Sequence, residues 1–206
     1  LFVWMGEILF RTKLSENLFE GLSPWMQKLP GGLIHVNVVG CAIFAAISGS
    51  SAATVATVGK MSIPELRKRN YPEKILLGSL AGSGTLGLLI PPSIILIIYG
   101  VTVQESIAKL FIAGIFPGIM IAIIFMTYVV IWSLMNKDKM PVLTEEIPFI
   151  EKIKKSGKLI PVILLIVSVI GSIYSGVATA TEAASLGVVG ALILSFFQKS
   201  LTIDSF

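Results

Sequence analysis

Charged residues are scarce in this sequence, which also contains a single cysteine and a single histidine. Only 14% of its 206 residues are charged and 54% are hydrophobic, which argues against a soluble domain. The lone Cys41 excludes an internal disulfide. The lone His35, without a Cys/His cluster, supports neither a transition-metal site nor an enzyme's nucleophile, base and orienting group. In such a chain the net charge of +4 is expected to report membrane topology, not a nucleic-acid partner.

Long apolar runs dominate the remainder of the sequence. A hydrocarbon core of about 30 Å needs roughly 20 apolar residues in a helix. The segments that meet or approach this length, and are predicted to be transmembrane helices, are 73–100, 110–135, 159–176 and 179–198. Residues 1–13 are predicted to be the end of a further transmembrane helix, whose start is expected upstream. The predicted fold class is therefore an all-α polytopic membrane protein.

A shorter apolar run, from Val36 to Ile47, stops at Ser48-Gly49-Ser50-Ser51. At 1.5 Å per residue this run reaches only about 18 Å, too short to cross a membrane. We therefore predict a re-entrant helical hairpin over 33–62, with its second arm from Ser51 to Met61 and its polar tip near the membrane centre. The alternative is one long, kinked span over 33–61.

The distribution of basic residues favours the hairpin over the single span. Lys and Arg accumulate in cytoplasmic loops. The hairpin leaves only Lys109 of the 16 basic residues outside the cell, whereas the single span also places Arg11, Lys13 and Lys28 there. The positive-inside rule therefore predicts a hairpin that opens toward the cytoplasm.

Polar segments separate the apolar ones. Residues 14–32 place apolar side chains on one helical face and are predicted to form an amphipathic interfacial helix, ended by a turn at Pro30-Gly31-Gly32. Residues 63–72 are predicted to be a basic cytoplasmic loop. Residues 136–158, rich in lysine and glutamate, are predicted to be a solvated cytoplasmic connector.

The apolar segment 73–100 is itself interrupted, which predicts a discontinuous transmembrane helix. Gly82, Gly84 and Gly87 loosen the helix, and Pro91 and Pro92 remove amide donors from it. Carbonyl groups freed in this way must be satisfied by protein, water, an ion or a substrate. The alternative is a simple proline kink.

Oxygen atoms gather at both interruptions and suggest a cation site. Ser48, Ser50 and Ser51 offer hydroxyl oxygens, and Gly49 allows conformations that turn carbonyl groups toward a common point. Oxygen ligands and unwound backbone are how transporters hold a hard cation such as sodium. Carbonyl groups of the second interruption would complete the cage. The alternative is that serine and glycine serve only close helix packing.

Helix N-termini are expected near Ser51 and Pro92, at the same two interruptions. Their partial positive charge and open amides suit a substrate carboxylate, and Ser93 offers a further hydroxyl. Ser51, Pro92 and Ser93 are therefore the candidate substrate-binding residues.

Thr179 and Glu182 have the spacing of a capping box at the start of the last helix. A glutamate within a membrane segment also suggests a proton relay. Its place near a helix start favours the capping role.

Several motifs together resemble a known family. In chain order they are Leu29-Pro30-Gly31-Gly32-Leu33, His35-Val36-Asn37-Val38, Ser48-Gly49-Ser50-Ser51, Gly84-Thr85-Leu86-Gly87, Ile90-Pro91-Pro92-Ser93 and Thr181-Glu182-Ala183-Ala184. Their order and spacing resemble the large membrane subunit (M subunit, DctM-like) of a tripartite ATP-independent periplasmic (TRAP) transporter.

The resemblance implies an elevator-type, inverted-repeat secondary transporter in a bacterial inner membrane. Such a transporter imports an organic carboxylate, often a dicarboxylate or a sialic acid, from a periplasmic substrate-binding protein. It works with a small membrane subunit, surrounded by membrane lipid, and uses Na⁺ as coupling ion without another cofactor. The resemblance maps the sodium site onto Ser48, Gly49, Ser50, Ser51, Gly82, Gly84, Thr85 and Gly87.

The sequence also departs from the family pattern. Ala180 stands where members commonly have proline, which makes the entry to the last helix less rigid. The inverted second half, with its own hairpin, is not supplied by this chain, so we expect a fragment that comprises the first half of the transport machinery. The remaining alternatives are a related broken-helix carrier that needs no binding protein, and a non-transporting membrane scaffold subunit.

Overall fold

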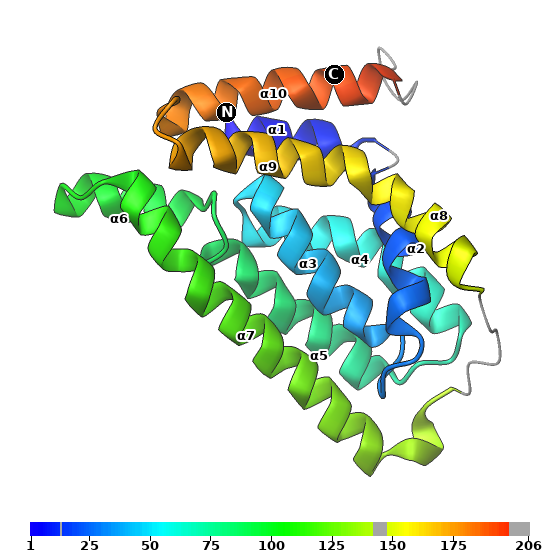
Figure 1. Cartoon of the computed structure of the whole chain (residues 1–206). Helices are drawn as coiled ribbons and strands as arrows, with labels where there is room; N and C mark the ends of the chain where they lie inside the picture. The colour runs from blue at the N-terminus through cyan, green and yellow to red at the C-terminus, as the bar shows by residue number, and fades with distance from the viewer. Residues whose placement is uncertain (13, 142–147, 198–206) are drawn as a thin grey trace.

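All regular structure is helical in residues 1–12, 14–141 and 148–197, the part of the chain that this computed structural model describes (Figure 1). The α-helices are α1 (Phe2–Phe10), α2 (Leu14–Met26), α3 (Ile34–Ser48), α4 (Ser51–Lys68), α5 (Glu73–Gly84), α6 (Ile94–Val103), α7 (Ile107–Met135), α8 (Phe149–Ser156), α9 (Ile160–Tyr174) and α10 (Ala180–Phe197). Short 3₁₀ turns are η1 (Thr85–Leu88), η2 (Lys137–Lys139) and η3 (Gly157–Leu159).

Three helical segments among the described residues are long and apolar enough to cross a membrane. They are Ile107–Met135, Phe149–Tyr174 and Ala180–Phe197, the second being α8, η3 and α9 in continuous succession. Large apolar side chains on them are exposed, such as Phe116 and Ile123 on α7, as expected for helices that face lipid. The chain is therefore an all-helical, polytopic membrane protein.

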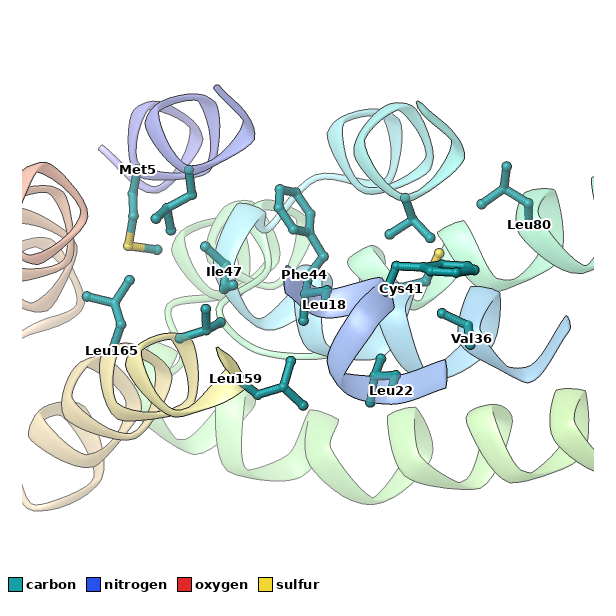
Figure 2. Packing of buried hydrophobic residues seen from close by; sticks show 14 of the residues in the cluster. Met5, Leu18, Leu22, Val36, Cys41, Phe44, Ile47, Leu80, Leu159 and Leu165 are labelled. Carbon is teal, nitrogen blue, oxygen red and sulfur yellow. The ribbon is translucent and has the colours of Figure 1, made fainter. Parts of the chain in front are cut away.

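Helix α3 lies at the centre of the fold. It packs against α4 and α5, and also contacts α1, α2 and α7. Its apolar side chains point in several directions, and Cys41, Phe44 and Ile47 are fully buried among neighbouring helices (Figure 2). A helix that is apolar on all sides requires such surroundings. Protein, not lipid, therefore covers this short helix.

Helices α3 and α4 form a helical hairpin with its tip at Gly49 and Ser50. Gly49 has a left-handed conformation with φ of 61°, which stops α3. Ser50 is extended and caps α4, because its Oγ accepts the N–H of Ala53 at 3.4 Å. Two local signals therefore end one arm and begin the other.

The second arm of the hairpin is longer than the sequence suggested. Helix α4 continues past Met61 to Lys68, so most of the predicted loop over 63–72 is helical. Arg67 and Lys68 lie in the last turn, where positive charge interacts favourably with the helix dipole. Asn70, with φ of 59°, follows the end of the helix.

Helix α2 turns much of its apolar face toward protein. Leu18 and Leu22 are buried, and α2 contacts α3 and α8 (Figure 2). These two side chains of the predicted amphipathic helix therefore pack on protein, against α3 and α8, and the place of α2 at the membrane surface stays a prediction. Trp25 is 43% exposed, and its Nε1 donates to Ser156 Oγ at 2.7 Å. Helix α2 thus joins the hairpin to α8.

Helices α1, α9 and α10 lie side by side in a separate layer (Figure 1). Met5 of α1 and Leu165 of α9 are both buried in the shared apolar core (Figure 2). Helix α10 begins with the predicted capping box, which the structure confirms: the Thr179 N–H donates to Glu182 Oε2 at 2.8 Å, and the Glu182 N–H donates to Thr179 Oγ1 at 3.3 Å.

Candidate functional site

The two interruptions of the apolar segments meet in the structure. The backbone N–H of Ile94, at the start of α6, donates to the carbonyl oxygen of Gly49 at the hairpin tip over 3.3 Å. A Cβ atom on Gly49 would lie 2.5 Å from the carbonyl oxygen of Pro92. The hairpin tip therefore lies directly against the segment between η1 and α6.

Turn η1 contacts the other side of the tip. A Cβ atom on Gly87 would lie 2.9 Å from the Ser51 amide nitrogen and 3.0 Å from the Ser50 carbonyl carbon. Real Cβ contacts to backbone are almost never this short, so only glycine permits this approach. Gly84 likewise faces Val55 of α4. Unwound backbone from two distant parts of the chain is therefore in contact.

Hydroxyl groups converge on the Ser50 carbonyl oxygen. Thr54 Oγ1 donates to it at 2.8 Å, and the fully buried Ser48 Oγ lies 3.2 Å from it. Ser48 Oγ and Thr54 Oγ1 are themselves 2.9 Å apart, and Ser48 Oγ also accepts the Ser50 N–H at 3.3 Å. The tip is thus a compact group of oxygen atoms held by its own hydrogen bonds.

The second interruption releases carbonyl groups from helical pairing, and those of Gly87 and Ile90 are two of them. Pro91 has no N–H, so the Gly87 carbonyl lacks the donor four residues on. Ile94 donates to Gly49 instead of to the Ile90 carbonyl. Neutral oxygen atoms of this kind are ligands for a hard cation, and broken transporter helices use them in that way.

Comparison with known sequences identifies the protein family to which the chain belongs. The model of the family described as "Tripartite ATP-independent periplasmic transporter, DctM component" matches residues 1–206. The chain belongs to this family. The resemblance drawn from the motifs is thereby confirmed. The family consists of transporter permease components, not enzymes.

The relatives of this DctM-family chain are named for several different substrates. It is 35% identical over 196 residues to the C4-dicarboxylate TRAP transporter large permease protein DctM of Pseudomonas aeruginosa, covering 95% of the chain and 45% of that relative. It is 34% identical to the ectoine/5-hydroxyectoine permease UehC of Ruegeria pomeroyi, covering 94% of the chain and 45% of UehC. It is 34% identical to the sialic acid permease SiaT of Haemophilus influenzae, covering 99% of the chain and 33% of SiaT. The chain spans less than half the length of these relatives.

Two predicted sodium ligands of the DctM-family chain do not lie at the hairpin tip. A Cβ atom on Gly82 would face the Phe125 ring of α7 at 3.5 Å, and the Gly82 carbonyl accepts the Thr85 hydroxyl at 2.7 Å. The Thr85 side chain is exposed. Helical rotation separates Gly82 from Gly84 by about 200°, which turns one toward α7 and the other toward the hairpin.

The predicted substrate residues of the second interruption are also engaged with protein. Ser93 is fully buried, and its Oγ donates to the Leu88 carbonyl at 2.7 Å. Helix α6 begins at Ile94, later than the predicted start near Pro92, and its first amide is bonded to Gly49. The open amides expected there are therefore partly occupied, whereas Ser51 remains in the first turn of α4 at the tip.

Sequence reasoning missed several polar groups near the tip. Thr54 follows Ser50 by four residues, a spacing at which a threonine bonds back to the backbone. Ile90 contributes only its carbonyl, a group that side-chain patterns do not reveal. Ser83 was not predicted, whereas Ser51 was; among the described residues both have a buried hydroxyl without a hydrogen-bond partner, and such groups are rare in native proteins. Both hydroxyls are thus available to a ligand.

Polar contacts outside the tip fix the hairpin against α5. Asn37 Nδ2 on α3 donates to the Leu76 carbonyl at 3.2 Å and to Ser79 Oγ at 3.0 Å, both on α5. At the start of α3, the Leu33 N–H donates to the Tyr71 hydroxyl at 3.0 Å. The Asn37 bonds join the hairpin to α5 and the Tyr71 bond closes the base of the hairpin, which together restrict the relative movement of the oxygen atoms at the tip.

Proposed function

We propose that the chain is the first of two hairpin-bearing halves of a sodium-coupled secondary transporter that imports an organic carboxylate across a bacterial inner membrane. The observation that carries this proposal is the Gly49–Ile94 hydrogen bond, which joins the two interruptions at one place. Paired helix breaks of this kind form ion and substrate sites in secondary transporters. Membership in the DctM family supports the same function.

The sodium ion is proposed to bind between the hairpin tip and the second interruption. Its ligands would come from the oxygen atoms of Ser48 and Ser50 on one side and the carbonyl groups of Gly87 and Ile90 on the other. The contact of Gly87 with the Ser50–Ser51 backbone supports this pairing. Neutral oxygens suit Na⁺ because it is a hard cation.

The substrate is proposed to be an organic carboxylate bound near the start of α4. The first turn of α4 carries partial positive charge, and the buried Ser51 hydroxyl there has no partner among the described residues. Named relatives transport C4-dicarboxylates and sialic acid, both of which are carboxylates.

The partners are proposed to be a periplasmic substrate-binding protein and a small membrane subunit. One relative combines both membrane components in its printed name, the isethionate TRAP permease DctMQ of Oleidesulfovibrio alaskensis, to which the chain is 35% identical. In the proposed elevator movement, the hairpin and α5 move together because Asn37 of α3 bonds to Leu76 and Ser79 of α5.

Uptake by the reconstituted full-length protein tests this function. Proteoliposomes containing the permease and its small subunit are given the binding protein, loaded with a labelled dicarboxylate or sialic acid. Accumulation is expected with an inward sodium gradient and not with an equal potassium gradient. Accumulation of either acid that is equal under both gradients, or that needs no binding protein, would contradict the proposal.

A further inference from the structure

A cavity of about 650 Å³ lies between α2, α4 and α8, away from the hairpin tip. Residues far apart in the sequence form it, because α2 and α8 lie side by side and α2 also contacts α4 (Figure 1). The residues that line it are Phe19, Glu20, Ser23, Pro24, Gln27, Lys60, Met61, Pro64, Glu65, Arg69 and Lys155. None of them contributes to the proposed transport site.

The charged groups of the cavity leave one positive charge. Its lining contains three cations, Lys60, Arg69 and Lys155, and two carboxylates, Glu20 and Glu65. Both carboxylates are already paired with cations: Glu65 lies 3.7 Å from Arg69, and Glu20 pairs with Lys158 outside the lining. Lys155 pairs with Glu151, which also lies outside the lining, so among the described residues Lys60 is the one lining cation left without a carboxylate and the cavity can accept a single negative charge.

Lys60 is the cation that an anion would reach. Among the described residues, no carboxylate lies within ion-pair distance of it, whereas Lys155 lies 3.0 Å from Glu151. The Lys60 ammonium lies 5.1 Å from the centre of the Phe10 ring, a cation–π contact that holds it near the protein surface. Its charge is thus positioned without being neutralised.

Four apolar side chains, together with the polar Ser23 and Gln27, form the rest of the cavity wall. Phe19, Pro24, Met61 and Pro64 line it beside the charged groups. A wall that combines apolar side chains with an unpaired ammonium group suits an amphiphile better than a free, fully hydrated anion.

Helix α8, which contributes Lys155, has the composition of a helix at a membrane surface. Phe149, Ile150 and Ile153 are exposed, and the helix also carries Lys152 and Lys154. Exposed apolar side chains interleaved with lysines are typical of interfacial helices that contact anionic lipid. The exposed Trp25 packs edge-on against Phe149 with ring centres 6.1 Å apart, which adds an aromatic ring of the kind found at membrane interfaces.

We propose that the cavity between α2, α4 and α8 binds the headgroup of an anionic phospholipid. The phosphate contacts Lys60 and Lys155, and the glycerol backbone and first acyl carbons lie on Phe19, Met61 and Pro64. A bound lipid connects the second arm of the hairpin to α2 and α8. The site is independent of the proposed sodium and substrate sites.

Native mass spectrometry of the full-length permease, released from nanodiscs of phosphatidylcholine containing a minority of phosphatidylglycerol, tests the site. The wild-type protein is expected to retain one phosphatidylglycerol after stepwise delipidation. Lys60→Gln and Lys155→Gln are each expected to reduce the retained fraction several-fold, and Lys60→Arg to preserve it. The matched control is Lys154→Gln, an exposed lysine of the same helix that does not line the cavity. It is expected to behave like the wild type.

Other outcomes of this experiment would overturn the proposal. Equal retention of phosphatidylcholine and phosphatidylglycerol would show that the headgroup charge is not recognised. Undiminished retention in both Lys60→Gln and Lys155→Gln would place the lipid elsewhere. Release of the lipid by millimolar glycerol 3-phosphate would show that a soluble phosphate ester is the ligand. Failure of the wild type to retain phosphatidylglycerol would exclude the site, including the case in which another segment of the full chain fills the cavity.

Discussion

The backbone N–H of Ile94 donates to the carbonyl oxygen of Gly49 over 3.3 Å, so the start of one helix is capped by the tip of another. This bond gives the freed amide of α6 a partner and leaves the Ile90 carbonyl without its usual helical donor. The interruption is therefore satisfied on its donor side by protein and open to a ligand on its acceptor side. That asymmetry is what a cation site requires.

Replacement of Gly49 by alanine is expected to disrupt both the tip and transport. A residue with a Cβ atom in the left-handed region costs about 1–2 kcal/mol, and here the Cβ would also meet the Pro92 carbonyl oxygen at 2.5 Å. Thermal unfolding in detergent should show a lower midpoint, and sodium-driven uptake should be lost. Gly78→Ala is the matched control, since nothing lies within 4 Å of its Cβ position. A Gly49→Ala protein with normal stability and uptake would contradict the described tip geometry.

Gly87→Ala is expected to separate η1 from the hairpin tip. Its Cβ would lie 2.9 Å from the Ser51 amide nitrogen, so one backbone segment must move away from the other. The apparent affinity for sodium in uptake assays should fall by about tenfold or more, equivalent to about 1.4 kcal/mol. Gly82→Ala provides the comparison, because its Cβ has ordinary contact with Phe125 and should change sodium affinity little. Equal effects of the two substitutions would argue against the assignment of Gly87 and Gly82 to different faces.

Tyr71→Phe is expected to loosen the hairpin at its base. The change removes the acceptor of the Leu33 N–H, and leaving a buried donor unpaired costs about 1–3 kcal/mol. The midpoint of thermal unfolding at neutral pH should therefore decrease. Tyr99→Phe, at an exposed position, should leave it unchanged. An unchanged midpoint for Tyr71→Phe would show that this bond does not stabilise the hairpin.

The Tyr71 hydroxyl is also expected to make the stability of the protein depend on pH in the alkaline range. Burial raises the pKa of Tyr71 above its ordinary value, against the smaller opposing effect of the Leu33 hydrogen bond. A raised pKa means that the folded state favours the neutral hydroxyl. This contribution to stability is full below the ordinary tyrosine pKa of about 10 and is lost as pH rises through the folded pKa. Wild-type stability should thus fall more steeply than that of Tyr71→Phe above about pH 10. Parallel pH profiles would contradict this assignment.

Glu182→Gln is expected to retain most transport activity. Glutamine can occupy the same capping-box position, so the bond from the Thr179 N–H is replaced and not lost. Glu182→Ala leaves Thr179 as the N-cap but removes the bond from the Thr179 N–H, which should lower stability by about 0.5–1.5 kcal/mol. Uptake rates of the two variants, measured at several pH values, distinguish capping from proton transfer. Loss of uptake in Glu182→Gln would favour the proton relay.

Much of the fold follows from local sequence signals. Apolar length identifies the three long helices, because a hydrocarbon core sets a minimum span. Gly49 and Ser50 mark one interruption through backbone conformation and capping, and Pro91 marks the other by removing a donor. The end of α4 was harder to predict, because basic residues suit both a cytoplasmic loop and the last turn of a helix. The membrane topology and the re-entrant depth of the hairpin remain predictions.

The contacts between the two interruptions could not be predicted from the sequence and are seen only in the structure. Spacing alone could have separated Gly84 and Gly87 from Gly82 and Thr85, since a rotation of about 100° per residue places them on different faces. It could not show which face meets the hairpin, because that depends on how α3, α4 and α5 pack. The burial of Leu18 has the same origin: an apolar helical face has the same pattern whether lipid or protein covers it.

The sodium dependence of uptake in Ser48→Ala and Ser50→Ala is the most direct test of a sodium site at the junction of the two interruptions. Full-length variants are reconstituted with their partners, and uptake is measured as a function of sodium concentration. The buried Ser62→Ala on α4 serves as control, since the Ser62 hydroxyl has no hydrogen-bond partner among the described residues. Half-maximal uptake is expected to shift to about tenfold higher sodium, a loss of about 1.4 kcal/mol, in both tip variants and not in the control. A sodium dependence unchanged from wild type in both tip variants would contradict a cation site at the junction of the two interruptions.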